Sequence, residues 1–121
     1  MLKPVKMIQT LLLSFMLALT FHVQAAYPDK PIKIIIGFPA GGPLDAHIRL
    51  LVERLQSALG QTVIVDYKAG AGGTVGAQFV AQSPSDGYTL LLANTGTMVI
   101  NPAIYTKASY DTLRDFQPIA R

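Results

Sequence analysis

The stretch that decides the fold runs from Ile32 to Gly42 and reads Ile-Lys-Ile-Ile-Ile-Gly-Phe-Pro-Ala-Gly-Gly. Its first seven residues are rich in β-branched side chains and almost continuously apolar, a pattern typical of a strand covered on both faces. The prolines and glycines of residues 39–43 predict a turn. A helix that ends at Gly60 is predicted next, because apolar residues recur at helical spacing at Ile48, Leu51, Val52, Leu55 and Leu59.

The same kind of unit is repeated further along the chain. Residues 62–65 predict a second strand, residues 69–73 a second glycine turn, and residues 75–80 a short helix. The apolar positions that mark this helix are Val75, Phe79 and Val80. A turn at residues 85–87 leads into a third predicted strand at residues 88–93. Strands and helices that alternate through short links predict an α/β fold, a parallel sheet with flanking helices.

The last part of the chain gives weaker signals. Asn101 and Pro102 are interpreted as a helix N-cap followed by proline at the first helical position. Residues 111–116 predict one further helical turn, and residues 118–120 resemble the start of another strand. Because nothing follows to complete that layer, the pattern suggests a piece of a longer protein.

Each predicted strand ends in a turn rich in glycine or hydroxyl residues. In an open parallel sheet such turns lie along one edge, where ligands bind. Glycine allows a ligand to approach the backbone closely, and amides at helix N-termini carry partial positive charge. We therefore predict a main-chain site for a small anion. The alternative, that these glycines only permit tight turns, stays open at this point.

The sequence offers few residues whose types and spacing would suit catalysis. Asp45 is interpreted as a capping or dipole partner of the first helical turn rather than as a catalytic acid. His47 lies two residues further on, and positions i and i+2 of a helix do not face each other, so the pair cannot chelate one metal. The absence of cysteine excludes disulfides and thiol chemistry. We predict no catalytic residue, no metal site and no cofactor.

The first 25 residues read as a secretory signal peptide. Lys3 and Lys6 precede an apolar stretch, and Val23-Gln24-Ala25 supplies small residues at a cleavage site. A membrane anchor is the rival interpretation, but the densest apolar core spans about eleven residues and a spanning helix needs roughly 20. Cleavage would leave eight basic and seven acidic side chains. A charge so close to neutral argues against nucleic-acid binding.

An ordered set of short motifs carries a family resemblance. The motifs are Tyr27-Pro28-Asp29-Lys30-Pro31-Ile32, Phe38-Pro39-Ala40-Gly41-Gly42 with Asp45, Ala58-Leu59-Gly60-Gln61, Gly70-Ala71-Gly72-Gly73, Ser85-Asp86-Gly87-Tyr88-Thr89-Leu90-Leu91, Asn101-Pro102 with Tyr105, and Asp115-Phe116-Gln117-Pro118-Ile119-Ala120. Together they resemble the Bug family, the periplasmic substrate-binding receptors of tripartite tricarboxylate transporters in Gram-negative bacteria. The resemblance covers residues 26–121. It departs from the common pattern at Gly37, Leu44 and Tyr67, where proline, threonine and asparagine are usual.

The resemblance implies a type II periplasmic-binding-protein fold of two α/β domains around a cleft. Members are roughly three times longer than this chain without residues 1–25, so residues 26–121 would form an incomplete first domain. The implied protein is a periplasmic monomer without cofactor that passes its ligand to membrane permease subunits. The implied ligand is a small organic acid: a di- or tricarboxylate, an amino acid or an aromatic acid.

The same resemblance places the ligand contacts in three turns. These comprise Phe38, Pro39, Ala40, Gly41, Gly42 and Asp45; Gly70, Ala71, Gly72 and Gly73; and Asn94, Thr95, Gly96 and Thr97. Half a cleft leaves an anion exposed to water, so we expect the isolated chain to bind its acid poorly or not at all. Two alternatives stay open: an exported doubly wound α/β enzyme acting on a phosphate- or nucleotide-like substrate, and an inactive truncated relic.

Overall fold

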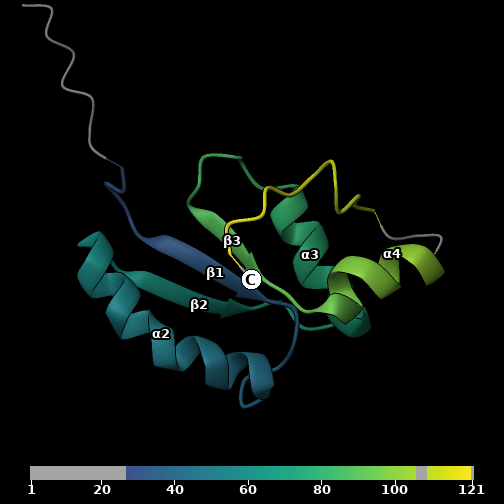
Figure 1. Cartoon of the computed structure of the whole chain (residues 1–121), viewed down its shortest axis with the longest axis horizontal. Helices are drawn as coiled ribbons and strands as arrows, with labels where there is room; N and C mark the ends of the chain where they lie inside the picture. The colour runs from purple at the N-terminus through teal and green to yellow at the C-terminus, as the bar shows by residue number, and fades with distance from the viewer. Residues whose placement is uncertain (1–26, 106–108, 121) are drawn as a thin grey trace, which may run out of the picture.

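A three-stranded parallel sheet forms the centre of the protein (Figure 1). The structure, a computed structural model, describes residues 27–105 and 109–120. Strand β1 (Ile32–Ile36) lies between β2 (Val63–Tyr67) and β3 (Thr89–Leu92), and both pairings are parallel. The predicted α/β fold with a parallel sheet is confirmed.

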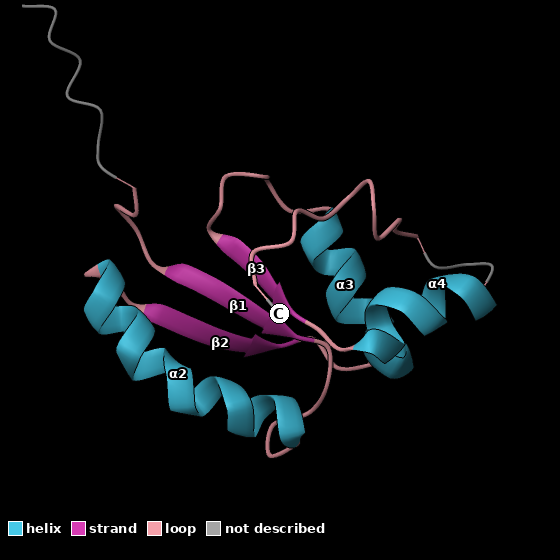
Figure 2. Cartoon of the chain, viewed as in Figure 1, coloured by secondary structure: helices cyan, strands magenta, loops and turns pink. Residues whose placement is uncertain are grey.

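The helices connect the strands in the predicted order (Figure 2). Helix α2 (Pro43–Leu59) follows β1, and a short 3-10 turn, η1 (Ala71–Gly73), leads from β2 into helix α3 (Thr74–Ala81). After β3 the chain forms a π-helical turn, η2 (Gly96–Ile100), that continues into the single turn α4 (Asn101–Ile104). Each strand is thus followed by a turn and a helical segment, which begin at the carboxyl end of that strand.

Helix α2 packs on the sheet through one apolar stripe. The buried core joins Ile34 and Ile36 of β1 and Val63 of β2 to Ile48 of α2. The helix side of this core consists of Leu44, Ile48, Val52, Leu55 and Leu59. The prediction that Leu51 belongs to the stripe was wrong, because Leu51 is 48% exposed. The buried face of α2 instead runs along Leu44, Ile48 and Val52, and Leu51 lies outside this face.

Helix α3 lies on the sheet through small residues. Its buried positions are Thr74, Gly76 and Ala77, whereas Val75 and Phe79 are more than 40% exposed. The short helix that Val75, Phe79 and Val80 marked is confirmed, but Val75 and Phe79 do not form its buried face. The cause is a close approach of backbones: a Cβ on Gly76 would lie 2.8 Å from the Cα of Gly37. Large apolar side chains do not fit between them.

The motifs Tyr-Pro-Asp-Lys (residues 27–30) and Ser-Asp-Gly-Tyr (residues 85–88) meet at the edge of the sheet where β1 and β3 begin. The Tyr88 hydroxyl donates to the Asp29 carboxylate at 2.5 Å, and the rings of Tyr27 and Tyr88 pack edge to face. The Lys30 ammonium lies 3.1 Å from Asp86 and 4.2 Å from the centre of the Tyr88 ring. These contacts fasten the segment before β1 to the turn before β3.

Of three further expectations for the C-terminal part, one is confirmed and two are wrong. Asn101 is not an N-cap, because it is the first residue of α4, which continues η2 without a break. Residues 111–116 form one turn, closed by a 2.9 Å bond from the Asp115 amide to the Asp111 carbonyl. Residues 118–120 are irregular rather than extended into a strand. The structure provides no parallel partner beyond β3 for them among the residues it describes.

The predicted signal peptide, residues 1–25, lies outside the described residues. Within residues 27–105 and 109–120, no helix has both the length and the apolar character that a membrane span requires.

Candidate functional site

The three predicted turns converge at the carboxyl ends of the strands, as the sheet topology requires (Figure 2). A Cβ on Gly37, at the end of β1, would lie 2.6 Å from the Cα of Gly73 in the second turn. A Cβ on Gly73 would in turn lie 2.9 Å from the ring of Phe38, and closer still to the Oγ1 of Thr97 in the third turn. Parts of all three turns are thus in contact.

The second turn is tethered by two side chains from η2 and α4. The Gly72 carbonyl accepts a 2.9 Å hydrogen bond from the Asn101 amide and a 3.2 Å bond from the Thr97 hydroxyl. The Asn101 amide also donates to the Thr74 hydroxyl at 3.2 Å. Gly72 has a φ of +63° and Gly73 a φ of +92°, values that favour glycine. Asn101 therefore shapes the turn, a role that its Asn-Pro signature did not reveal.

The third turn is held from both sides of Thr97. The side-chain oxygen of Asn94 accepts bonds from the Thr97 amide at 2.9 Å and from its hydroxyl at 3.2 Å. The buried hydroxyl of Tyr110 donates to the Thr97 carbonyl. Thr97 is only 1% exposed, so its side chain belongs to the framework of the turn rather than to its surface.

The first turn is fixed by Asp45. The Asp45 carboxylate accepts the Gly41 amide at 2.7 Å, the Arg49 Nε at 2.9 Å and the Tyr67 hydroxyl at 2.5 Å. Asp45 lies in the first turn of α2, but its carboxylate reaches back past the N-cap residue Gly42 to the residue before it. Asp45 is the acidic residue of the first helical turn, as predicted, but it does not cap the helix, because its hydrogen bond from Gly41 belongs to the turn before the N-cap.

The pKa of Asp45 is lowered to about 2, first by the hydrogen bond from Tyr67, then by those from Arg49 and from the Gly41 amide. A carboxyl whose folded pKa lies below its ordinary value of 3.8 stabilises the fold above that value, and this stability is lost as the pH falls toward 2. We expect Asp45→Asn to reduce the fall in the free energy of unfolding between pH 5 and pH 2. Urea titrations at both pH values measure it; parallel losses in the two proteins would contradict the expectation.

Hydrogen bonds within the protein already occupy some of the amides of the predicted site. The amides of Gly41, Gly73 and Thr97 are bonded to Asp45, to the Gly70 carbonyl and to the Asn94 side chain. Among the residues that the structure describes, the amides of Ala40, Gly42 and Gly72 are among those of the three turns that have no acceptor within the protein. The main-chain anion site predicted from the glycine turns therefore narrows to fewer donors than the sequence offered.

No cluster for acid–base or metal chemistry lies beside these turns in the part of the chain that the structure describes. His47 is exposed on α2. Within the same described residues, no group of three or more histidine, aspartate or glutamate side chains is placed to hold a metal ion. The chemistry that the arrangement supports is hydrogen bonding to an anion by peptide amides.

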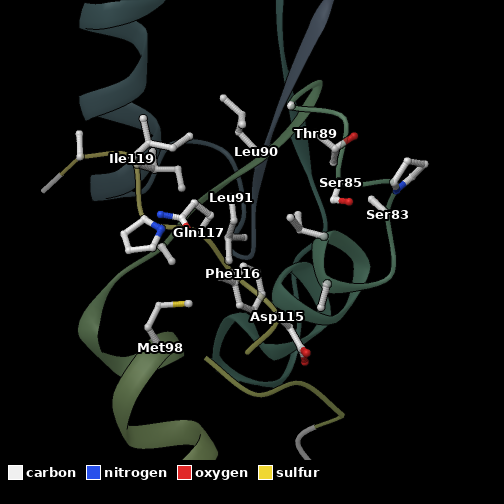
Figure 3. A pocket seen from close by; sticks show the side chains of 18 residues that line it. Ser83, Ser85, Thr89, Leu90, Leu91, Met98, Asp115, Phe116, Gln117 and Ile119 are labelled. Carbon is white, nitrogen blue, oxygen red and sulfur yellow. The ribbon is translucent and has the colours of Figure 1, made fainter. Parts of the chain in front are cut away.

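A hollow of about 560 Å³ lies elsewhere, along the outer side of β3 (Figure 3). Leu91 lies beside Phe116 of the C-terminal segment there, and Leu90 and Ile119 also line the hollow. Its one charged lining residue among those described is Asp115, whose carboxylate is paired with Arg114 at 2.7 Å, so the lining offers a bound carboxylate no cationic partner. This hollow is therefore a poor candidate for the anion site that the turns form.

A parallel sheet of this order with helices packed on it defines the α/β class, in which ligands commonly bind at the carboxyl ends of the strands. Residues 47–121 match the tripartite tricarboxylate transporter family receptor, TctC, and the chain belongs to this family. It is 43% identical over 115 residues to a UPF0065 protein of Bordetella bronchiseptica, covering 93% of this chain and 34% of that protein. It is 40% identical over 95 residues to BugT of Bordetella pertussis, covering 78% and 29%. The chain spans about a third of the length of these curated relatives.

Solved structures share the fold. The periplasmic binding protein BugD superposes with a TM-score of 0.73 at 41% identity, over 77% of this chain and 31% of that one. MatC (Rpa3494) from Rhodopseudomonas palustris with bound malate gives 0.72 at 34% identity, over 76% and 31%. R. palustris Rpa4515 with adipate gives 0.68 at 31% identity, over 72% and 29%. The predicted family resemblance is confirmed.

Proposed function

We propose that this chain is the first ligand-binding part of a periplasmic solute receptor that captures a small carboxylate. The observation that carries the proposal is the contact of three turns at one sheet edge, with the amides of Ala40, Gly42 and Gly72 left without acceptors among the described residues. Peptide amides at such an edge are suited to a carboxylate, because they donate hydrogen bonds without a counter-charge. No reactive side chain is needed for this task.

The ligands of the related structures support the same class of substrate. MatC holds malate and Rpa4515 holds adipate, both dicarboxylates. We propose a di- or tricarboxylate as the ligand of this receptor, with an amino acid or an aromatic acid as the alternative. Export through residues 1–25, a second domain that closes over the ligand, and delivery to membrane permease subunits complete the proposal.

The test is a titration of the ¹⁵N-labelled chain with malate and adipate, followed by amide chemical shifts. We expect shifts confined to residues 38–42, 70–73 and 94–97, because in the described part of the chain these turns follow the carboxyl ends of the three strands. Malamide, which has the shape of malate without its charge, serves as the matched control and should give no such shifts. Shifts that map to the hollow beside β3 instead would contradict the proposed site.

We also predict that the isolated chain binds its carboxylate only weakly. When residues 26–121 are studied alone, the three turns are open to water, so the amide–carboxylate hydrogen bonds stay in a high dielectric, where charge interactions are weak. We expect dissociation constants in the millimolar range, roughly a thousandfold weaker than the micromolar binding that about −8 kcal/mol represents. Isothermal titration checks this, and micromolar binding by residues 26–121 alone would show that one domain suffices.

A further inference from the structure

Three elements of the protein meet at the carboxylate of Asp45. The side chain is 4% exposed, and it joins the turn after β1, helix α2 and the end of β2. Arg49, one helical turn further along α2, brings its Nε within 3.0 Å of both carboxylate oxygens, and its terminal nitrogen lies 3.3 Å from the Tyr67 hydroxyl. The donors of this cluster thus bond to one another or to Asp45.

The cluster holds a residue of the turn that has no packing contact of its own. Gly41 has a φ of +86°, and apart from its two chain neighbours no residue has an atom within 4 Å of the place that a Cβ would occupy. Packing therefore does not hold Gly41 itself in place. The hydrogen bond from the Gly41 amide to Asp45 does, and it fixes the peptide plane on which the directions of the neighbouring Ala40 and Gly42 amides depend.

We propose that Tyr67, together with Arg49, is a positioning residue of the carboxylate site: it holds Asp45 so that Asp45 turns the Gly41 amide inward and leaves the Ala40 and Gly42 amides facing the ligand. Tyr67 acts through Asp45 rather than by touching the ligand. Only the final step, in which the Ala40 and Gly42 amides bind the ligand, rests on the proposed function. The coupling of Tyr67 to the Gly41 turn exists in the protein without ligand.

The geometry makes the hydroxyl of Tyr67 the controlling group. It is the donor to Asp45 that comes from the sheet, and it donates at 2.5 Å. Arg49 is 65% exposed in its side chain, so its share of the attraction is screened by water. Removing the hydroxyl should therefore free Asp45 to move with α2 and loosen the turn.

The experiment follows the Gly41 amide by ¹⁵N–¹H NMR as the pH is lowered, in the natural chain and in Tyr67→Phe. In the natural chain this amide should titrate with the Asp45 carboxyl, whose pKa is about 2. In Tyr67→Phe the midpoint should rise toward 3.8, and the amide should exchange with solvent faster at pH 5. Tyr27→Phe is the matched control, since it also removes a tyrosine hydrogen bond, to the Gly87 carbonyl at 2.8 Å, at the opposite edge of the sheet.

Three outcomes are distinguishable. A Gly41 amide that behaves identically in Tyr67→Phe and the natural chain overturns the inference, whatever the ligand does. Loss of malate-induced shifts at residues 38–42 in Tyr67→Phe, with those at residues 70–73 kept, supports it through to binding. If malate shifts none of the three turns in any protein while Tyr67→Phe still alters the Gly41 amide, the positioning stands and carboxylate binding by residues 26–121 alone fails.

Discussion

Gly37→Ala is expected to lower the free energy of unfolding by about 3 kcal/mol, at the upper end of the cost of overpacking. The added Cβ would lie 2.6 Å from both the Cα and the carbonyl oxygen of Gly73. Both neighbours are backbone atoms, so neither can rotate away as the end of a side chain would. Relief requires β1 and the start of α3 to separate, which opens the junction of the first two turns. Urea unfolding followed by circular dichroism measures the loss.

Gly41→Ala is the matched control for that change. Its added Cβ meets nothing within 4 Å, but the φ of +86° is a conformation that alanine rarely adopts. The cost should be about 1 kcal/mol, from backbone strain alone. A Gly37→Ala protein that is as stable as Gly41→Ala would show that the strand and helix do not approach as closely as the structure has them.

The sequence predicted the order of the elements well because periodicity and turn residues are local signals. Strand β1 was expected at residues 32–38 and is found at Ile32–Ile36, and Gly60 ends α2 in a left-handed conformation with its amide bonded to Gln56. Each of these features depends on residues that lie next to one another in the chain. The confirmed parts of the fold are of this kind.

The faces of the helices were predicted less well because they depend on distant partners. Val75 and Phe79 mark α3 as apolar, yet the helix is buried through Gly76 and Ala77. That choice follows from Gly37, far earlier in the chain, which admits only small residues opposite it. Nothing within α3 itself carries this information.

The candidate site shows the same division. The sequence identified the three glycine and hydroxyl turns, because they follow the strands directly. It did not identify Tyr67, Arg49, Asn101 or Tyr110, the side chains that hold those turns. Tyr67, Asn101 and Tyr110 bond to residues far from them in the chain, and the direction of the Arg49 side chain could not be predicted from the sequence. Asn101 also carried the local signature of a helix N-cap, which is a different role. Which amides are free is decided by these bonds, so it could not be predicted before they were known.

Asn101→Ala is expected to cost about 2 kcal/mol, since it removes two hydrogen bonds from a buried amide. The Gly72 carbonyl would keep only the bond from Thr97, and the buried Thr74 hydroxyl would lose its bond from the Asn101 amide. Asn101 is 7% exposed, so water cannot replace the lost groups without entering the junction of the turns. We also expect the amides of residues 70–73 to exchange with solvent faster than those of residues 38–42.

Gln78→Ala provides the control for loss of an amide side chain. Gln78 lies on α3 and donates to the Ser109 hydroxyl at 3.2 Å in an exposed pair, so its removal should change stability by no more than about 0.5 kcal/mol. Chemical denaturation compares the two variants, and hydrogen exchange locates the loosened segment. Equal losses in both variants would mean that Asn101 does not tether the second turn; a large loss with faster exchange confined to residues 70–73 would establish that α4 sets the shape of the ligand edge.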